Sequence, residues 1–216
     1  MHQRNLTIIL LVGVAIGLVV LVAGSTGNRF PDNQQGYSPR QPVTYSHRLH
    51  AGELGIDCRF CHTAAEHGKH AGIPSADVCL KCHKYVTSSF DLLQAELTKA
   101  DLEKRKPAPV ISEDLQQLYE LLKLKNPQDP VRDPTGGVPW VRVHNLPDFV
   151  AFDHRAHVSA GVTCQKCHGP VESMERVRQV ESLSMGWCVN CHREATANGI
   201  NGKAVHASLD CSTCHY

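Results

Sequence analysis

The ten cysteines of this 216-residue chain form five Cys-x-x-Cys pairs, and a histidine directly follows each pair. In such a run, two thiols can add to the two vinyl groups of a porphyrin, and the next residue presents an imidazole to the iron. The pattern therefore predicts five covalently attached haems c. The predicted thioether residues are Cys58, Cys61, Cys79, Cys82, Cys164, Cys167, Cys188, Cys191, Cys211 and Cys214, and the predicted proximal ligands are His62, His83, His168, His192 and His215.

Zinc ribbons and disulfide frameworks are the alternatives to haem, because both use paired cysteines. A zinc ribbon gives no reason for a histidine after every second cysteine, and a disulfide needs no histidine at all. Both alternatives therefore explain less of the pattern. The formal net charge of +1 gives no basic surface for nucleic acid, so we expect no nucleic-acid partner.

The N-terminus carries 18 apolar or small residues without a charge, from Leu6 to Ala23. This length is near that needed to cross a bilayer, and Arg4 before it favours an N-terminus inside the cell. Haem c is attached outside the cytoplasm, so we expect export. The alternative is a signal peptide cleaved near Ala23-Gly24-Ser25. The sequence thus predicts a single-pass protein of the bacterial cytoplasmic (inner) membrane, with its haem domain on the periplasmic side.

Two segments of the chain resemble each other. Residues 45–62 and 152–168 both read aromatic-x-His-Arg-x-His, then Gly-hydrophobic-x-Cys-x-x-Cys-His, and a second motif follows each. We therefore expect two two-haem units and a fifth haem appended to them. The predicted organisation is a cytoplasmic N-terminus (1–5), a transmembrane anchor (6–24), a tether (25–42), a first two-haem unit (43–83), a haem-free helical insertion (84–143), a second two-haem unit (144–193) and a fifth haem segment (194–216).

The predicted insertion shows two helical patterns. Ser88-Ser89-Phe90-Asp91 resembles a capping box, with Pro107 ending the run, and Asn126-Pro127 closes a second segment that begins after Ser112. The insertion is either a helical hairpin packed on the haem domain or a surface for docking a partner. The apolar positions are Leu93, Leu97 and Ala100 in the first helix and Leu115, Leu118, Tyr119 and Leu122 in the second.

Glycine and proline occur throughout the chain, which favours loops and short helices with little sheet. We expect a mainly α fold with much irregular structure, built around haems. It would be a multihaem cytochrome c with class III-like two-haem repeats on a single N-terminal transmembrane helix.

The sixth iron position decides whether a haem carries electrons or meets a substrate. His47/His50 and His154/His157 are i, i+3 pairs, which lie on one helix face and could each serve two porphyrins. They are the predicted distal ligands, and ordinary surface histidines are the alternative.

A fifth distal ligand is also needed. His144 is the first choice, and Met185 is the rival, because methionine ligation would raise that haem's potential. Met185 could equally be a packing residue. His67, His70 and His206 rank lower.

Several blocks between the motifs carry a resemblance to a family. They are Tyr-Ser-His-Arg-Leu-His-Ala-Gly-Glu-Leu-Gly-Ile-Asp-Cys at 45–58, Val-His-Asn-Leu-Pro-Asp-Phe-Val at 143–150, LSMGWCVNCHR at 183–193 and the C-terminal Asp-Cys-Ser-Thr-Cys-His-Tyr. With the N-terminal helix, the chain resembles the pentahaem c-type cytochrome subunit of bacterial alternative complex III, a quinol:electron-acceptor oxidoreductase. One departure is the stretch from Leu92 to Lys125, which is longer than expected of that family.

The resemblance implies an electron relay without its own substrate site. Its partners would be an iron–sulfur/molybdopterin-like peripheral subunit and polytopic quinol-binding subunits, with a mobile periplasmic cytochrome or copper protein, or a terminal oxidase, as acceptor. The alternatives are a stand-alone membrane-anchored multihaem quinol dehydrogenase, a multihaem reductase with an open iron site, and an electron store that joins no complex.

Overall fold

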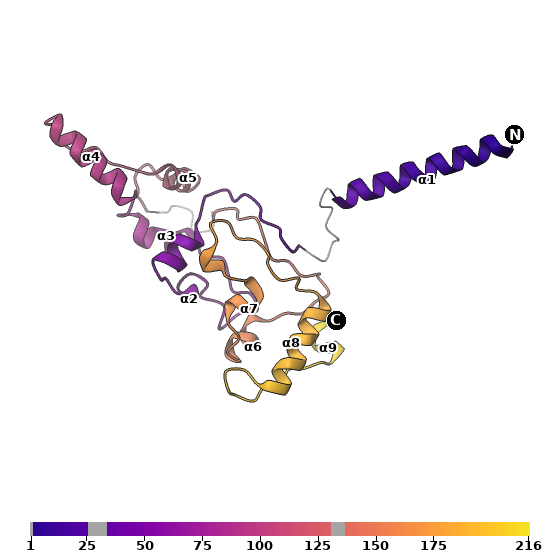
Figure 1. The fold of residues 1–216 in the computed structure, drawn as a ribbon. Coiled ribbons are helices and arrows are strands. Elements are labelled where there is room, and N and C mark those ends of the chain that lie inside the picture. The colour runs from indigo at the N-terminus through magenta and orange to yellow at the C-terminus, as the bar shows by residue number, and fades with distance from the viewer. Residues whose placement is uncertain (1, 26–33, 131–136) are drawn as a thin grey trace.

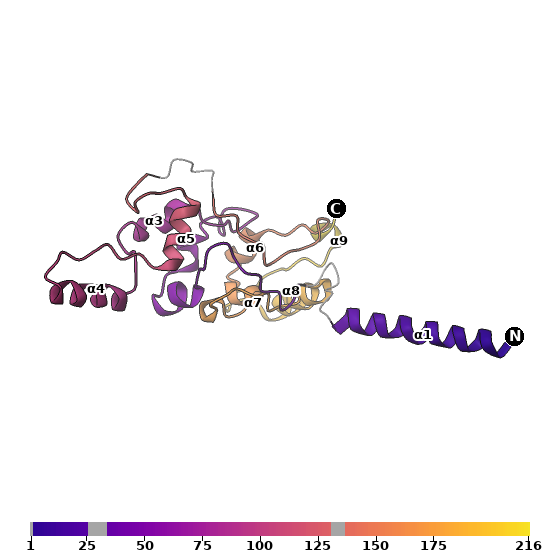
Figure 2. The same cartoon turned by 90° about the horizontal axis from the view of Figure 1, so that it is seen from above.

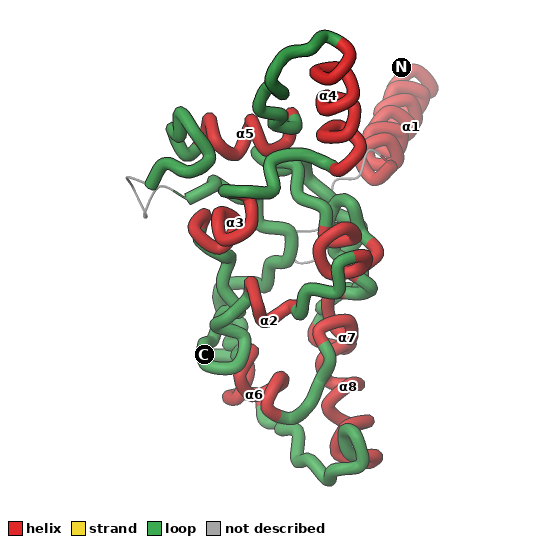
Figure 3. Tube along the Cα trace, turned by 90° about the vertical axis from the view of Figure 1, so that its left-hand side faces the viewer, coloured by secondary structure: helices red, strands yellow, loops and turns green. Residues whose placement is uncertain are grey.

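The fold is built from short helices joined by long loops. The computed structural model describes residues 2–25, 34–130 and 137–216. Within these ranges no strand forms, and two isolated β-bridges join Val150 to His215 and Ile200 to Lys203. Figures 1 and 3 show this mixture of helix and loop, which confirms the predicted mainly helical and irregular fold. The elements are α1 (His2–Ser25), η1 (Arg48–Glu53, a π-helix), α2 (Cys58–Cys61), α3 (Ala76–His83), α4 (Phe90–Leu102), α5 (Glu113–Leu121), α6 (His154–Ser159), α7 (Cys164–His168), η2 (Val171–Ser173, a 3₁₀-helix), α8 (Met185–Asn198) and α9 (Cys211–Cys214).

The N-terminal helix α1 is apolar over 18 residues, Asn5–Val22, and this window is long enough to cross a bilayer. None of the window is buried against the rest of the protein. The predicted apolar N-terminal helix is therefore present. A membrane anchor and a signal sequence share these properties.

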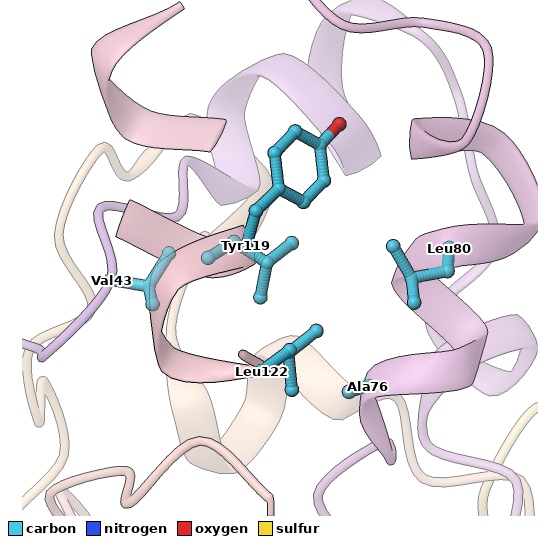
Figure 4. Close-up of a cluster of buried hydrophobic side chains, with 6 residues drawn as sticks. Val43, Ala76, Leu80, Tyr119 and Leu122 are labelled. Carbon is cyan, nitrogen blue, oxygen red and sulfur yellow. The ribbon is translucent and has the colours of Figure 1, made fainter. Parts of the chain in front are cut away.

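The main hydrophobic cluster joins the second motif helix α3 to helix α5 of the predicted insertion. Ala76 and Leu80 of α3 face Tyr119 of α5 (Figure 4), and Leu118 of α5 belongs to the same cluster. The Tyr119 hydroxyl also donates a hydrogen bond to the carbonyl of His83, at 2.5 Å. Burial of these side chains drives α5 onto the helix that carries a predicted proximal ligand. The cluster is completed by Val43 and Leu122.

Helix α4 extends away from the rest of the body, at the end that carries α3 and α5 (Figures 1 and 2). The Ser89 hydroxyl accepts a hydrogen bond from the Leu92 amide at its N-terminus, within the predicted capping segment. The helix ends at Leu102, earlier than expected from Pro107, because Lys104 adopts a left-handed conformation with φ of 51°. Ala100 is buried, whereas Phe90 is 71% exposed.

Residues 34–43 form a strap across the body. The Gly36 amide donates to the carbonyl of Gln179 at 2.6 Å, and the Gln179 amide donates back to the carbonyl of Tyr37 at 3.0 Å. Further along, the Gln41 side chain bonds both backbone groups of Val141. Residues 34–42 of the predicted tether are therefore held against segments more than 90 residues away, and the strap ends at Val43 in the hydrophobic cluster.

The two repeats pack on each other reciprocally. In one direction, the backbone of η1 approaches η2 so closely that a Cβ on Gly52 would lie 2.3 Å from the carbonyl oxygen of Glu172. In the other direction, the first residue of α6, His154, donates its amide to the carbonyl of Lys69, at 3.1 Å. In each direction, the helix with the predicted distal histidines meets the segment after the other repeat's first motif. This exchange resembles an isologous interface between two subunits.

Candidate haem-attachment sites

Each Cys-x-x-Cys pair lies within a helix: three pairs occupy the four- or five-residue helices α2, α7 and α9, and two begin at the fourth residue of α3 and of α8. Asp57, Asp210 and Ser184 cap three of these helices by accepting a backbone N–H, which starts the turn just before the first cysteine or close to it. One helical turn brings both thiols and the following imidazole to the same region. Four of the ten cysteines are exposed, one each in α2, α3, α7 and α9. Within the described ranges, no group of three or more His, Cys, Asp or Glu residues is placed to hold a metal ion.

Three of the predicted proximal imidazoles have one nitrogen committed to a backbone carbonyl. Nδ1 of His62 lies 2.6 Å from the Gly72 carbonyl oxygen, and Nδ1 of His83 lies 2.8 Å from that of Val86. Nδ1 of His192 makes the same contact at 2.7 Å with Ser208. A carbonyl accepts, so Nδ1 carries the proton and Nε2 keeps its lone pair. Metal-binding histidines are usually oriented in this way.

The predicted distal histidines repeat this arrangement at equivalent positions. Nδ1 of His50 donates to the carbonyl four residues earlier, at 2.8 Å, and Nδ1 of His157 does so at 2.9 Å. Nδ1 of His154 donates to the carbonyl of Lys69 at 2.9 Å, which links the second repeat to the loop after the first motif. These three rings also present Nε2 as the free nitrogen.

Distal and proximal imidazoles face one another in pairs. The ring centroids are 6.0 Å apart for His50 and His83, and 6.0 Å apart for His157 and His192. Two imidazoles on opposite sides of one metal, each bonded at about 2 Å, have centroids roughly 6 Å apart. In both repeats, the second histidine of the i, i+3 pair therefore faces the histidine of the second motif.

The first histidine of each pair faces the first motif of its own repeat. The rings of His154 and His168 are 6.4 Å apart and nearly parallel, at 8°. In the other repeat, His62 is the residue whose charge acts most strongly on His47. Burial, followed by the charges of His62 and His50, lowers the pKa of His47 to about 4. The His47 imidazole is thus neutral at neutral pH.

His144 lies elsewhere than the other predicted ligands. Its ring is 4.3 Å from that of His168 and inclined by 77°, too close for the two to bind opposite sides of one metal. Its Nε2 is buried without a hydrogen-bond partner, and burial lowers the pKa of His144 to about 4. A buried imidazole nitrogen of this kind is costly unless it binds something. His144 therefore stays a predicted ligand, but not for the third motif.

The fifth motif has two candidate distal ligands, His144 and Met185. In the described part of the chain, the ring beside His215 is Phe149, stacked at 5.7 Å. Met185 lies at the start of α8 and is 67% exposed. His144 and Met185 therefore both stay predictions for this position. The lower-ranked His67, His70 and His206 are exposed.

The motifs of the first repeat meet each other and the third motif through their cysteines. Burial and the neighbouring thiol of Cys82 raise the pKa of Cys61, so the first and second motifs are adjacent. Burial and then Cys164, through its charge and a hydrogen bond, raise the pKa of Cys58. Cys58 and Cys164 hold equivalent positions in the two repeats. The first and third motifs therefore meet where the repeats join.

The second repeat continues the row. Burial and the neighbouring Cys191 and Cys188 raise the pKa of Cys167 to about 11, so the third and fourth motifs are adjacent. Burial and the neighbouring Cys214 raise the pKa of Cys188, which places the fifth motif beside the fourth. We call this arrangement the motif row: second, first, third, fourth, fifth. Figures 1 and 3 show its helices α3, α2, α7 and α8 following one another in that order.

The chain suits a large, flat, apolar group at these sites. Among the described residues, ten hydrophobic side chains are buried, and six of them form the cluster around α3 and α5. Apolar side chains next to the motifs are open instead, including Leu49, Phe60 and Phe149. Paired thiols, imidazoles with free Nε2 and open apolar walls together form the donor set that haem c requires.

The C-terminal part of the chain matches a known protein family. The family described as cytochrome c7 and related cytochrome c matches residues 150–216, which contain three of the five motifs and the pair His154/His157. The chain is a multihaem c-type cytochrome. Its C-terminal part is cytochrome c7-like, and the first repeat extends the same pattern towards the N-terminus.

A curated relative covers nearly the whole cytochrome. It is the multihaem cytochrome c subunit of menaquinone reductase from Nitratidesulfovibrio vulgaris, and the two are 27% identical over 93% of this chain and 87% of the relative. The similarity therefore includes the predicted insertion and both repeats.

Sequence reasoning missed the groups that orient the imidazoles. The carbonyls of Gly72, Val86 and Ser208 hold proximal rings, and that of Lys69 holds a distal one. Every residue has a carbonyl, so no sequence signal could identify these four. The aromatic residue before each distal pair was visible in the repeat, but its contact with both imidazoles was not.

Proposed function

We propose that this cytochrome holds five haems c and serves as an electron-transfer subunit of a membrane complex that oxidises or reduces a quinone. The motif row is the observation that carries the proposal, because it links all five attachment sites through neighbouring cysteines. The relative's role as the multihaem subunit of menaquinone reductase supports it. When bound, each haem supplies reversible one-electron chemistry at iron.

The chain's own residues would hold each group, orient its ligands and exclude water. The cysteines provide the thioether links, and the histidines of the motifs provide the proximal ligands. His50, His154 and His157 face proximal rings at a spacing suited to a shared metal, and His47 completes this set. Four of the five sites would then be closed on both sides. A closed site binds no substrate, so we propose that the cytochrome alone is not an enzyme.

Two related complexes fit this role. The resemblance to alternative complex III suggests electrons leaving a quinol for a mobile periplasmic cytochrome or copper protein, or for a terminal oxidase. The relative belongs to an enzyme named for the reverse direction, menaquinone reduction. The resemblance to alternative complex III also implies polytopic quinone-binding subunits and an iron–sulfur/molybdopterin-like peripheral subunit as neighbours. The direction depends on the potentials of those neighbours. We favour the quinol-oxidising complex on the blocks at 45–58, 143–150 and 183–193.

We also propose that α1 is a retained anchor. Its exposed apolar window of 18 residues is long enough to span a bilayer, and Arg4 precedes it. The haem domain would then lie on the periplasmic side of the cytoplasmic membrane, where haem c is attached.

The test is purification of the cytochrome from membranes in mild detergent, followed by identification of co-migrating proteins. We expect an iron–sulfur protein and a polytopic subunit at constant stoichiometry. Adding quinol to the isolated cytochrome should then leave its haems oxidised, whereas quinol should reduce them in the complex. Rapid reduction of the isolated chain would favour the stand-alone quinol dehydrogenase. A chain that never co-migrates with such subunits would contradict the proposal.

A further inference from the structure

One aromatic ring contacts both distal imidazoles in each repeat. In the first repeat, Tyr45 stacks on His50 with ring centroids 4.5 Å apart and planes inclined by 24°. The same ring meets His47 edge-on, at 4.8 Å and 87°. A single side chain two residues before the i, i+3 pair thus touches both of its members.

The second repeat reproduces this geometry almost unchanged. Phe152 stacks on His157 at 4.6 Å and 28°, and it meets His154 edge-on at 4.9 Å and 86°. The backbones around the two aromatics differ, because His50 lies in a π-helix and His157 in an α-helix. Recurrence on different local backbones indicates that the ring contact itself is the feature held in common.

The aromatic ring supplies an orientation that hydrogen bonds alone do not. His50 and His157 are fixed by their Nδ1 bonds to carbonyls four residues earlier. Nδ1 of His47, in contrast, is buried without a hydrogen-bond partner. Its edge-on contact with Tyr45 therefore takes the place of the missing bond. Because one imidazole is stacked on the ring and the other stands on it, the two are steeply inclined to each other.

We propose that Tyr45 and Phe152 are positioning residues that fix the planes of both distal imidazoles in their repeats. The proposal rests on the proposed function, because it requires those imidazoles to be axial ligands. It also accounts for different angles between facing rings: 8° for His154 with His168 and 40° for His157 with His192. In the first repeat, His50 and His83 are inclined by 63°.

These angles have a spectroscopic consequence. In low-spin ferric haem, the angle between the axial imidazole planes determines how the iron d orbitals split. Near-parallel planes give a rhombic electron paramagnetic resonance signal, and steeply inclined planes give a signal with a larger maximal g value. The holoprotein should therefore show a rhombic low-spin signal from the third site beside signals of larger maximal g value.

The test is the spectrum of the oxidised holoprotein for Phe152→Leu, with haem content measured on the same sample. We expect loss or a clear shift of the rhombic signal and a shift of one further signal, since Phe152 touches two ligands. Phe152→Tyr keeps the ring and should restore the original spectrum. Phe90→Leu, on exposed α4, is the matched control and should change nothing.

Tyr45→Leu gives an independent reading in the other repeat, with Tyr45→Phe as its conservative partner. It should shift two low-spin signals and leave the rhombic one unchanged. Spectra of both leucine variants that superimpose on the wild type at full haem content would overturn the proposal. A wild-type spectrum dominated by high-spin iron would instead overturn the proposed function, whatever the variants show.

Discussion

An imidazole binds a metal well when one nitrogen is held as a donor and the other is left free. Six of the predicted ligand rings meet this condition through backbone carbonyls, on both the proximal and the distal side. Backbone acceptors do not change with sequence, so this orientation is insensitive to most side-chain substitutions. A single substitution therefore affects metal binding most strongly when it replaces a ligand histidine itself.

Replacing His157, the predicted distal ligand of the fourth motif, tests whether this imidazole binds the metal. His157→Ala removes the imidazole that faces His192 at 6.0 Å. We expect one haem per chain to become five-coordinate or water-bound, which adds a high-spin ferric signal to the electron paramagnetic resonance spectrum. His70→Ala, at an exposed histidine, is the control and should leave the spectrum unchanged. An unchanged His157→Ala spectrum would remove His157 from the ligand set.

At the scale of elements, the two helices of the predicted insertion differ in what they bury. α5 and its C-cap Leu122 contribute to the cluster on α3 through Leu118, Tyr119 and Leu122, whereas the α4 side chains Phe90 and Leu102 are more than two-thirds exposed. Packing on the haem domain therefore describes α5, and α4 is the part left open for other contacts. The two predicted alternatives, packing on the haem domain and docking of a partner, therefore apply to different helices.

The difference predicts unequal costs for the same substitution. Leu118→Ala should lower the free energy of unfolding by about 2–5 kcal/mol, because it leaves a cavity beside Leu80. Leu102→Ala, at a side chain that is 79% exposed, should stay within about 0.5 kcal/mol. Denaturant unfolding of the holoprotein measures both. Equal costs would mean that α5 does not pack on the second motif helix.

Pairing of the Glu96 carboxylate with the loop after α4 is pH-sensitive, and we call this contact the loop closure. Glu96 accepts hydrogen bonds from the Arg105 guanidinium and from the Ala108 amide, the latter at 2.6 Å. Bonding to Arg105 lowers the pKa of Glu96 to about 2, from an ordinary value of 4.5. A lowered folded-state pKa means that this closure is fully present above about pH 4.5 and is lost as pH falls towards 2.

Hydrogen exchange at the Ala108 amide measures this closure. We expect protection at pH 5 that weakens at lower pH once the intrinsic exchange rate is corrected for. Glu96→Gln should lower the protection at pH 5 already, and Glu103→Gln, which bonds Arg105 alone, should lower it less. Protection that is independent of both changes would show that the carboxylate does not hold the loop.

At the scale of the whole molecule, the reciprocal packing of the repeats brings the first and third motifs together. Gly52 allows this approach, because a Cβ there would meet the Glu172 carbonyl at 2.3 Å. Gly52→Ala should therefore cost about 1–3 kcal/mol of stability through overpacking between backbones. Gly137→Ala, in open space, should cost little. Similar melting of the two variants in a thermal scan would argue against a tight junction.

The sequence predicted the repeats, the motifs and the i, i+3 histidine pairs, because each is a local pattern with a chemical reason. It could not predict which repeat faces which, since contacts such as His154 with Lys69 join residues 85 apart. The strap at 34–43 could not be predicted either, because its partner Gln179 lies far along the chain. The position of His144 beside His168 is likewise a tertiary property that no spacing rule contains.

Intact mass spectrometry of the mature protein, with digestion to locate the modified peptides, tests the assignment of haem to all five motifs most directly. The mass should equal that of the mature polypeptide plus five haem groups, one on each peptide that carries a Cys-x-x-Cys-His motif. An unmodified chain, or a motif peptide recovered with free thiols, would contradict the assignment.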